Sequence, residues 1–140
     1  MSDPADVCTT ELVRLFVPGH PIPQERAGRR WVPSRFLRPG HTRSYDPAAS
    51  ASWKRTVAIV CGTQRTAAWP WPGPVWGSLE FFVVPTAGGA LPGDVDNLAK
   101  AVLDALRRLV YRDDVQIRRI TLSKDPATRR PGVAIHLVGR

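Results

Sequence analysis

Residues 94–109 read DVDNLAKAVLDALRRL, and this stretch carries the clearest secondary-structure signal of the chain. Its apolar residues recur every three or four positions, which places them on one side of a helix. These residues are Leu98, Ala101, Val102, Ala105, Leu106 and Leu109. Asn97 is a favourable N-cap residue, so we expect a helix from Asn97 to Leu109 with one apolar and one polar face.

Strand-like segments flank this helix on both sides. Apolar or alternating runs occur at residues 12–17, 75–84, 115–122 and 133–137. The alternation slips once near Arg118 and Arg119, which indicates a β-bulge. A second helix is expected from Pro47, with Asp46 as its N-cap, to a stop at Gly62. The order predicts an α/β chain of the α+β type, with a single mixed β-sheet and two main helices.

The length of 140 residues favours one domain over residues 1–140, in which residues 1–10 form a flexible tail. No run of about 18 apolar residues predicts a membrane span, and the first ten residues do not resemble a signal peptide. Cys8 and Cys61 are too few and too far apart for a zinc site. We therefore expect a cytoplasmic protein without a small-molecule cofactor.

The acidic residues are concentrated in a basic chain. The formal net charge is +8, yet five of the twelve acidic residues lie between Asp94 and Asp114. Crowded carboxylates raise one another's pKa unless a positive partner lies among them. A divalent cation is such a partner, and a basic surface around it suits a polyanion. This combination predicts a metal-dependent enzyme that acts on nucleic acid.

Asp94 and Asp96 are the first candidate ligands. In an extended segment, residues two apart point the same way, so their carboxylates can lie side by side. Mg²⁺ prefers oxygen ligands and keeps several waters, so two or three carboxylates suffice, and Mn²⁺ is a plausible substitute. A structural alternative stays open, in which Asp96 and Asn97 serve only to cap the helix.

Asp113 and Asp114 form a second acidic pair. If Val115 and Ile117 face the core, strand alternation places Asp114 and Gln116 together on the open face. Asp114 is then the third candidate ligand. Asp113 is expected either in a turn or as a hydrogen-bond acceptor that supports a ligand without touching the metal.

Lys100 lies one helical turn after the first carboxylate pair, where a cation can stabilise charge on a phosphate. The alternative for Lys100 is a simple salt bridge to Asp96 or Asp104.

Candidate DNA contacts are mostly arginines, which outnumber lysines by 17 to 3. Trp31 and Phe36 lie among the arginines of residues 26–43, a pattern that suits contact with a nucleic-acid backbone. Two alternatives stay open. A genome rich in G and C would also raise the ratio of arginine to lysine, and the arginines could belong to a solvated loop whose aromatic residues anchor it to the core. The predicted contacts are Arg26, Arg29, Arg30, Arg35, Lys100, Arg107 and Gln116.

Residues 93–106 and 110–117 resemble the signature of the RusA family of Holliday junction resolvases. Members read Asp-x-Asp-Asn-Leu-x-Lys, then Asp-Ala-Leu, then Asp-Asp-x-Gln, and each step is present in this chain. The resemblance implies that Asp94, Asp96 and Asp114 bind Mg²⁺ and that Lys100 is essential. It also implies a homodimer that nicks four-way DNA junctions. Residues 24–28 depart from the family, which often has lysine before an Arg-Pro-Arg run there.

Together with this resemblance, the residues predict a Mg²⁺-dependent, structure-specific endonuclease, and the resemblance implies that it makes paired symmetric nicks in four-way junctions during recombination and repair. Asp94, Asp96, Asp114 and Lys100 are its expected catalytic residues, and branched DNA and a second copy of the chain its partners. Two alternatives remain. One is a non-catalytic, structure-selective DNA-binding protein, and the other is a phosphatase-like enzyme with a small substrate.

Overall fold

The computed structural model describes residues 8–24 and 47–140. Within them the chain forms one mixed four-stranded sheet and two α-helices, which confirms the predicted α+β fold. In chain order the elements are β1 (Thr10–Pro18), α1 (Pro47–Gly62), β2 (Val75–Val83), α2 (Val95–Leu106), the short 3₁₀-helix η3 (Asp114–Gln116), β3 (Ile117–Pro126) and β4 (Gly132–Gly139).

The strand order in the sheet is β1-β4-β2-β3. Strand β4 is antiparallel to both of its neighbours, whereas β2 and β3 are parallel and are connected through α2. Val75 pairs with Ile117, but the next residue, Trp76, pairs with Arg119. Arg118 is therefore an extra residue in β3, and the predicted bulge is confirmed.

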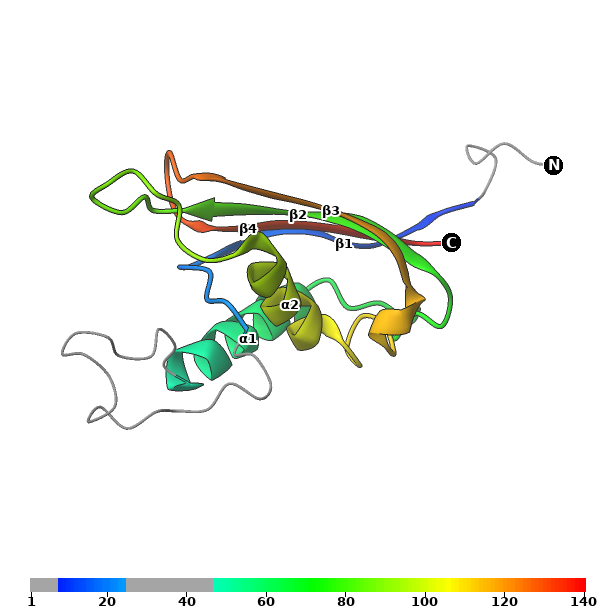
Figure 1. The fold of residues 1–140 in the computed structure, drawn as a ribbon. Coiled ribbons are helices and arrows are strands. Elements are labelled where there is room, and N and C mark those ends of the chain that lie inside the picture. The colour runs from blue at the N-terminus through cyan, green and yellow to red at the C-terminus, as the bar shows by residue number, and fades with distance from the viewer. Residues whose placement is uncertain (1–7, 25–46) are drawn as a thin grey trace, which may run out of the picture.

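Both helices cover the same face of the sheet (Figure 1). Alternate residues of β4 (Val133, Ile135 and Leu137) are buried on this face. From α1, Trp53 and Val57 are buried in the same core, as the helical spacing predicts. The apolar stripe of α2 meets them through Leu98, Ala101, Val102 and Leu106. The polar edge of α2 is left at the surface, and it carries the candidate site.

Helix α2 begins and ends earlier than expected. Its N-cap is Asp94, in an extended conformation, whereas Asn97 lies inside the first turn and is only 5% exposed. The helix ends at Leu106 because Arg108 adopts a left-handed conformation with φ 67°. The chain then turns inward, and Val110 and Tyr111 enter the core. The predicted N-cap at Asn97 and the predicted end at Leu109 are therefore wrong.

The segment before β3 is not a strand. Residues Asp114–Gln116 form η3, and Val115, which was expected in the core, is 82% exposed. Asp113 is the N-cap of η3, and its side chain and that of Gln116 form a capping box. Because residues 114–116 form a 3₁₀-helix and not a strand, Asp114 and Gln116 do not share one face of a strand, and that expectation is wrong. Asp113 is a turn residue, as predicted.

The Trp/Pro segment before β2 belongs to the fold. Trp69 is 7% exposed within the core cluster, and the indole nitrogen of Trp71 donates to the carbonyl of Pro74 at 3.1 Å. In the described part of the chain, no helix combines the length and the apolar character that crossing a membrane requires.

Candidate active site along helix α2

Asp94 and Asp96 lie at the N-terminus of α2. The Asp94 carbonyl accepts the first helical hydrogen bond, from the amide of Leu98 at 2.9 Å, while its side chain makes no capping bond. Asp96 is in the first turn, and both residues are exposed. The N-terminus of a helix carries partial positive charge, so it stabilises carboxylates there. The expectation that Asp94 and Asp96 share one side of an extended segment is therefore wrong, because Asp96 already lies in the helix.

Gly93 makes the turn into this helix possible. Its φ of +86° lies in the left-handed region, which glycine adopts without strain. A Cβ atom at this position would lie 3.3 Å from atoms of the Leu98 side chain. The bend that presents Asp94 is therefore packed directly against the first turn of α2.

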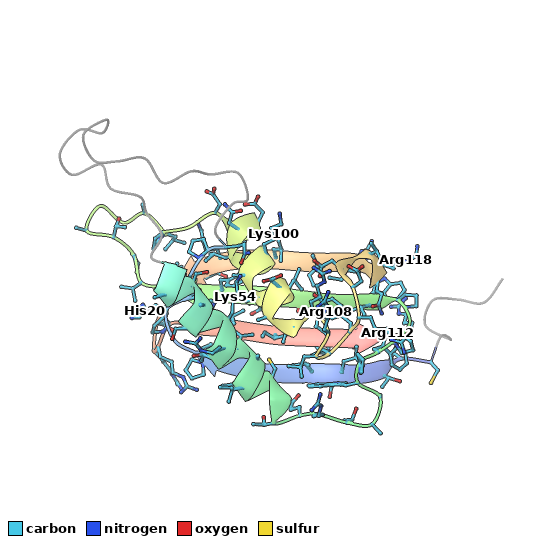
Figure 2. All side chains as sticks on the ribbon, turned by 90° about the horizontal axis from the view of Figure 1, so that it is seen from below. His20, Lys54, Lys100, Arg108, Arg112 and Arg118 are labelled. Carbon is cyan, nitrogen blue, oxygen red and sulfur yellow. The ribbon has the colours of Figure 1, made fainter. Side chains whose placement is uncertain are left out.

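Lys100 lies one turn further along α2. It is exposed, and Figure 2 shows it on the side of the helix that faces away from α1. Asp104, one possible partner, is instead bonded to Lys54 of α1, with 3.0 Å between Nζ and Oδ2. The polar face of α2 was expected to use Asp104 as an ion-pairing residue, and this is confirmed, with Lys54 as its partner. Lys100 follows Asp96 by four residues in α2, so the two side chains lie on the same side of the helix.

Asp114 lies next to the later part of α2. The Tyr111 hydroxyl is 2.9 Å from Asp114 Oδ1 and 2.7 Å from the carbonyl oxygen of Leu103. Burial, followed by the neighbouring charge of Asp114, raises the pKa of Tyr111 well above its ordinary value. Its hydroxyl is therefore a permanent donor near neutral pH, and its single proton is shared between two acceptors.

The three predicted ligands are spread along the helix. Asp96 and Leu103 are seven residues apart, so Leu103, which Tyr111 links to Asp114, lies about 10 Å further along α2 than Asp96. Among the described residues, no group of three His, Cys, Asp or Glu side chains could hold a metal ion. The oxygen atoms of Asp94 and Asp96 suit Mg²⁺ with its waters. Asp114 does not complete a three-carboxylate set with them in this structure.

The topology explains this separation. A parallel βαβ unit places the start of its helix near the carboxyl ends of the strands that it connects. Asp94 and Asp96 follow β2, whereas Asp114 precedes the first residue of β3 and lies toward the opposite end of the sheet. The tyrosine contact brings Asp114 alongside α2 but not to its first turn.

Gln116 joins the turn at η3 to the loop before β2. Its side-chain oxygen accepts hydrogen bonds from the amides of Arg112 and Asp113, both at 2.7 Å. Its side-chain nitrogen donates to the carbonyls of Trp71 at 2.7 Å and Gly73 at 2.8 Å. These four bonds use the full capacity of a glutamine side chain. The geometry therefore supports a structural role, and the DNA contact predicted for Gln116 stays a prediction.

Other basic residues gather at the far end of α2. Arg107 is half-buried, and its Nε lies 3.9 Å from Asp113 Oδ1, while Arg108 is exposed. Figure 2 shows Arg108 near Arg112 and Arg118, at the end of the molecule formed by η3 and the start of β3. The sequence interpretation omitted Arg112 and Arg118. The density of arginines in residues 107–119 is the signal that could have identified them.

Arg26, Arg29, Arg30 and Arg35 lie outside the described residues. The last described residue before them, Gln24, donates its backbone N–H to the carbonyl of Asn97 at 2.9 Å. The chain therefore enters the arginine-rich segment from a point bonded to the first turn of α2, beside Asp94 and Asp96.

The bond from Tyr111 to Asp114 can be measured by a double-mutant cycle. Tyr111→Phe is expected to lower the free energy of unfolding by about 1–2 kcal/mol, because Asp114 and the Leu103 carbonyl lose their shared donor. The cost should shrink by about half in an Asp114→Ala background, since one acceptor is already gone. Chemical denaturation measures all four proteins. Asp113→Ala is the matched control and should be additive with Tyr111→Phe; additivity at Asp114 would contradict the bond.

Two comparisons with known proteins bear on this site. The family model described as endodeoxyribonuclease RusA matches residues 18–138. An uncharacterized protein of Bacillus subtilis (strain 168), YqaN, is 30% identical over 130 residues, which cover 81% of this chain and 87% of that protein. The family match spans both helices, η3, β2, β3 and all of β4 except its last residue, whereas β1 lies outside it apart from Pro18.

Proposed function

Because this chain belongs to the RusA family of endodeoxyribonucleases, we propose that it is a Holliday junction resolvase. It acts as a homodimer, requires Mg²⁺, and makes paired symmetric nicks in four-way junctions during recombination and repair inside the cell. One observation carries the proposal. The family match includes α2, whose N-terminus presents Asp94 and Asp96 with Lys100 one turn away.

Asp94 and Asp96 are the residues that would hold the metal ion. When bound, Mg²⁺ polarises the scissile phosphate and lowers the pKa of a bound water, and Mn²⁺ can replace it. The resemblance adds Asp114 as a third ligand, although the structure places it further along α2. The protein's own contribution is the N-terminus of α2, which presents both carboxylates at the surface, where the helix dipole favours negative charge.

Lys100 supplies positive charge next to the carboxylates. Its ammonium group can neutralise a phosphate oxygen as negative charge develops during cleavage. Asp104, its nearest acidic neighbour toward the C-terminus of the helix, is already paired with Lys54. This pairing leaves Lys100 available to DNA at the edge of α2 that faces away from α1.

A dimer with two-fold symmetry suits a four-way junction, because two equivalent sites can cut two equivalent strands. Arginines 26, 29, 30 and 35 and the basic end formed by Arg107, Arg108, Arg112 and Arg118 bind phosphates without reading the sequence. Binding through such contacts should weaken steeply as salt is added.

Arg108 offers a clean test of the basic end, because its loss need not harm the fold. Arg108→Gly is expected to raise the free energy of unfolding by about 0.5–1 kcal/mol, since glycine relieves the positive φ of 67°. The same change should weaken junction binding and reduce the slope of log K against log salt by about 1. Titrations at several salt concentrations give the slope. Arg65→Gly is the control, because Arg65 is exposed in the turn after α1. Equal slopes for Arg108→Gly and Arg65→Gly would show that Arg108 does not contact the DNA.

A nicking assay tests the proposed function. The full chain is incubated with an immobile four-way junction and with linear duplex of the same sequence, each with Mg²⁺ or with EDTA. We expect paired symmetric nicks in the junction that require Mg²⁺, together with an intact duplex. Sedimentation of the protein alone and bound to the junction tests the homodimer.

One observation favours a second candidate, a structure-selective DNA-binding protein without catalysis. The described residues hold no group of three side chains able to bind a metal ion. Tight junction binding without nicking, under Mg²⁺ or Mn²⁺, would establish that candidate. Hydrolysis of a small phosphate ester with a KM insensitive to salt would instead indicate the phosphatase-like alternative.

A further inference from the structure

Lys124 of β3 holds the backbone that leads into Asp94. Its Nζ donates hydrogen bonds to the carbonyl oxygens of Leu91 at 2.9 Å and Gly93 at 2.5 Å. Lys124 pairs in register with Phe81, which is fully buried in the core. The Lys124 side chain therefore leaves the sheet on the face covered by the helices and reaches the bend before α2.

The connection that Lys124 holds has few other ties to the sheet. Residues 84–90 are exposed, and their turn is bonded within itself, from the amide of Gly89 to Thr86 and from the amide of Thr86 to Ala90. After this exposed turn, the chain is tied to β3 by the two hydrogen bonds from the Lys124 ammonium group to the carbonyls of Leu91 and Gly93. Loss of that contact would free the bend while leaving the packed core in place.

The Lys124 ammonium group is half-buried, and two backbone carbonyl oxygens replace part of the water that burial removes from it. An apolar side chain in the same place could not bond to these carbonyls. The bend that Lys124 holds leads directly into Asp94, the N-cap of α2, and Asp96 follows in the first turn. The contact of Lys124 therefore acts on the backbone that presents the two carboxylates.

We infer that Lys124 is a positioning residue for the nuclease site, an inference that rests on the proposed function. By fixing the carbonyls of Leu91 and Gly93, it sets the direction from which the chain enters α2 and so the place of the Asp94 carboxylate. Small displacements of such a group reduce catalysis strongly, because the reacting groups must be aligned to within fractions of an ångström. Lys124 acts through the backbone and is not a catalytic residue.

Lys124→Met tests the inference, because methionine keeps the apolar part of the side chain and removes the donors. Single-turnover cleavage of a four-way junction is expected to fall about fiftyfold, while the junction Kd changes by less than about threefold. The Mg²⁺ concentration for half-maximal rate should rise. Arg119→Met is the matched control, since it also removes one positive charge from β3 but lies in register with Trp76, on the face without helices. It should cleave at the wild-type rate.

Hydrogen exchange gives a readout that does not depend on cleavage. In Lys124→Met, the amides of residues 98–101, which bond to the carbonyls of the first turn of α2, should exchange about tenfold faster, while those of β4 stay protected. A wild-type protein that cuts no junction would refute the proposed function. Hydrogen exchange would then still show whether Lys124 holds the bend before α2. The inference is overturned by unchanged exchange in residues 98–101. It is equally overturned by a loss of junction affinity as large as the loss of cleavage, which would make Lys124 a phosphate contact.

Discussion

Asp94→Asn and Asp96→Asn are each expected to lower junction cleavage by about a thousandfold while the junction Kd changes by less than about threefold. Asparagine keeps the size and hydrogen-bonding ability of the side chain but removes the charge that a divalent cation requires. It is also an equally good N-cap, so α2 should still begin at the same residue. Single-turnover cleavage and binding titrations in Mg²⁺ measure the two effects separately.

Asp104→Asn is the matched control for these variants. It removes one carboxylate from the same helix, where Asp104 is paired with Lys54 at the surface. The lost ion pair should cost less than about 1 kcal/mol and leave cleavage unchanged. Wild-type cleavage by Asp94→Asn or Asp96→Asn would show that these carboxylates serve only the helix N-terminus. Asp114→Asn then decides its own role: a thousandfold loss places Asp114 at the metal, and a loss below about tenfold leaves it as the partner of Tyr111.

Gln116→Leu is expected to lower the free energy of unfolding by about 3 kcal/mol and the midpoint of thermal unfolding by about 10 °C. Leucine fills a similar volume but leaves two amides and two carbonyls without their partner. Gln116→Glu should be at least as harmful, because it places a carboxylate against the carbonyls of Trp71 and Gly73. Chemical and thermal denaturation of the full chain measure both changes.

Gln64 provides the control for Gln116. Its side chain also bonds two backbone groups, the amide and the carbonyl of Arg14 at 2.9 and 2.8 Å, but at an exposed site. Gln64→Leu should therefore cost less than about 1 kcal/mol, since water replaces the lost partners. If Gln116→Leu kept its stability and weakened junction binding instead, the DNA contact predicted from the sequence would be correct and the structural role wrong.

Much of the fold could be predicted because its signals are local. The helix over residues 47–62 follows from a proline at its start, a glycine at its end and apolar residues at helical spacing. The bulge at Arg118 appears as a slip in alternation, and the buried face of β4 as regular alternation. The misplaced ends of α2 have a different cause. Asp94, Asp96 and Asn97 can all cap a helix, and the sequence alone does not distinguish them; in the structure Asp94 is the cap, after a left-handed Gly93 that lies against Leu98.

The candidate site divides in the same way. The sequence by itself determined the kinds of chemistry: a carboxylate pair, a lysine one turn away, and basic residues around them. Only the tertiary structure decided which groups meet, because these contacts join residues that are far apart in the chain. Lys124 bonds to Gly93, Gln116 bonds to Trp71 and Gly73, and Asp114 is set apart from Asp96 by the length of the helix between the parallel strands β2 and β3. Spacing along a sequence fixes neighbours within a helix or strand, whereas neighbours across elements depend on how the whole core packs.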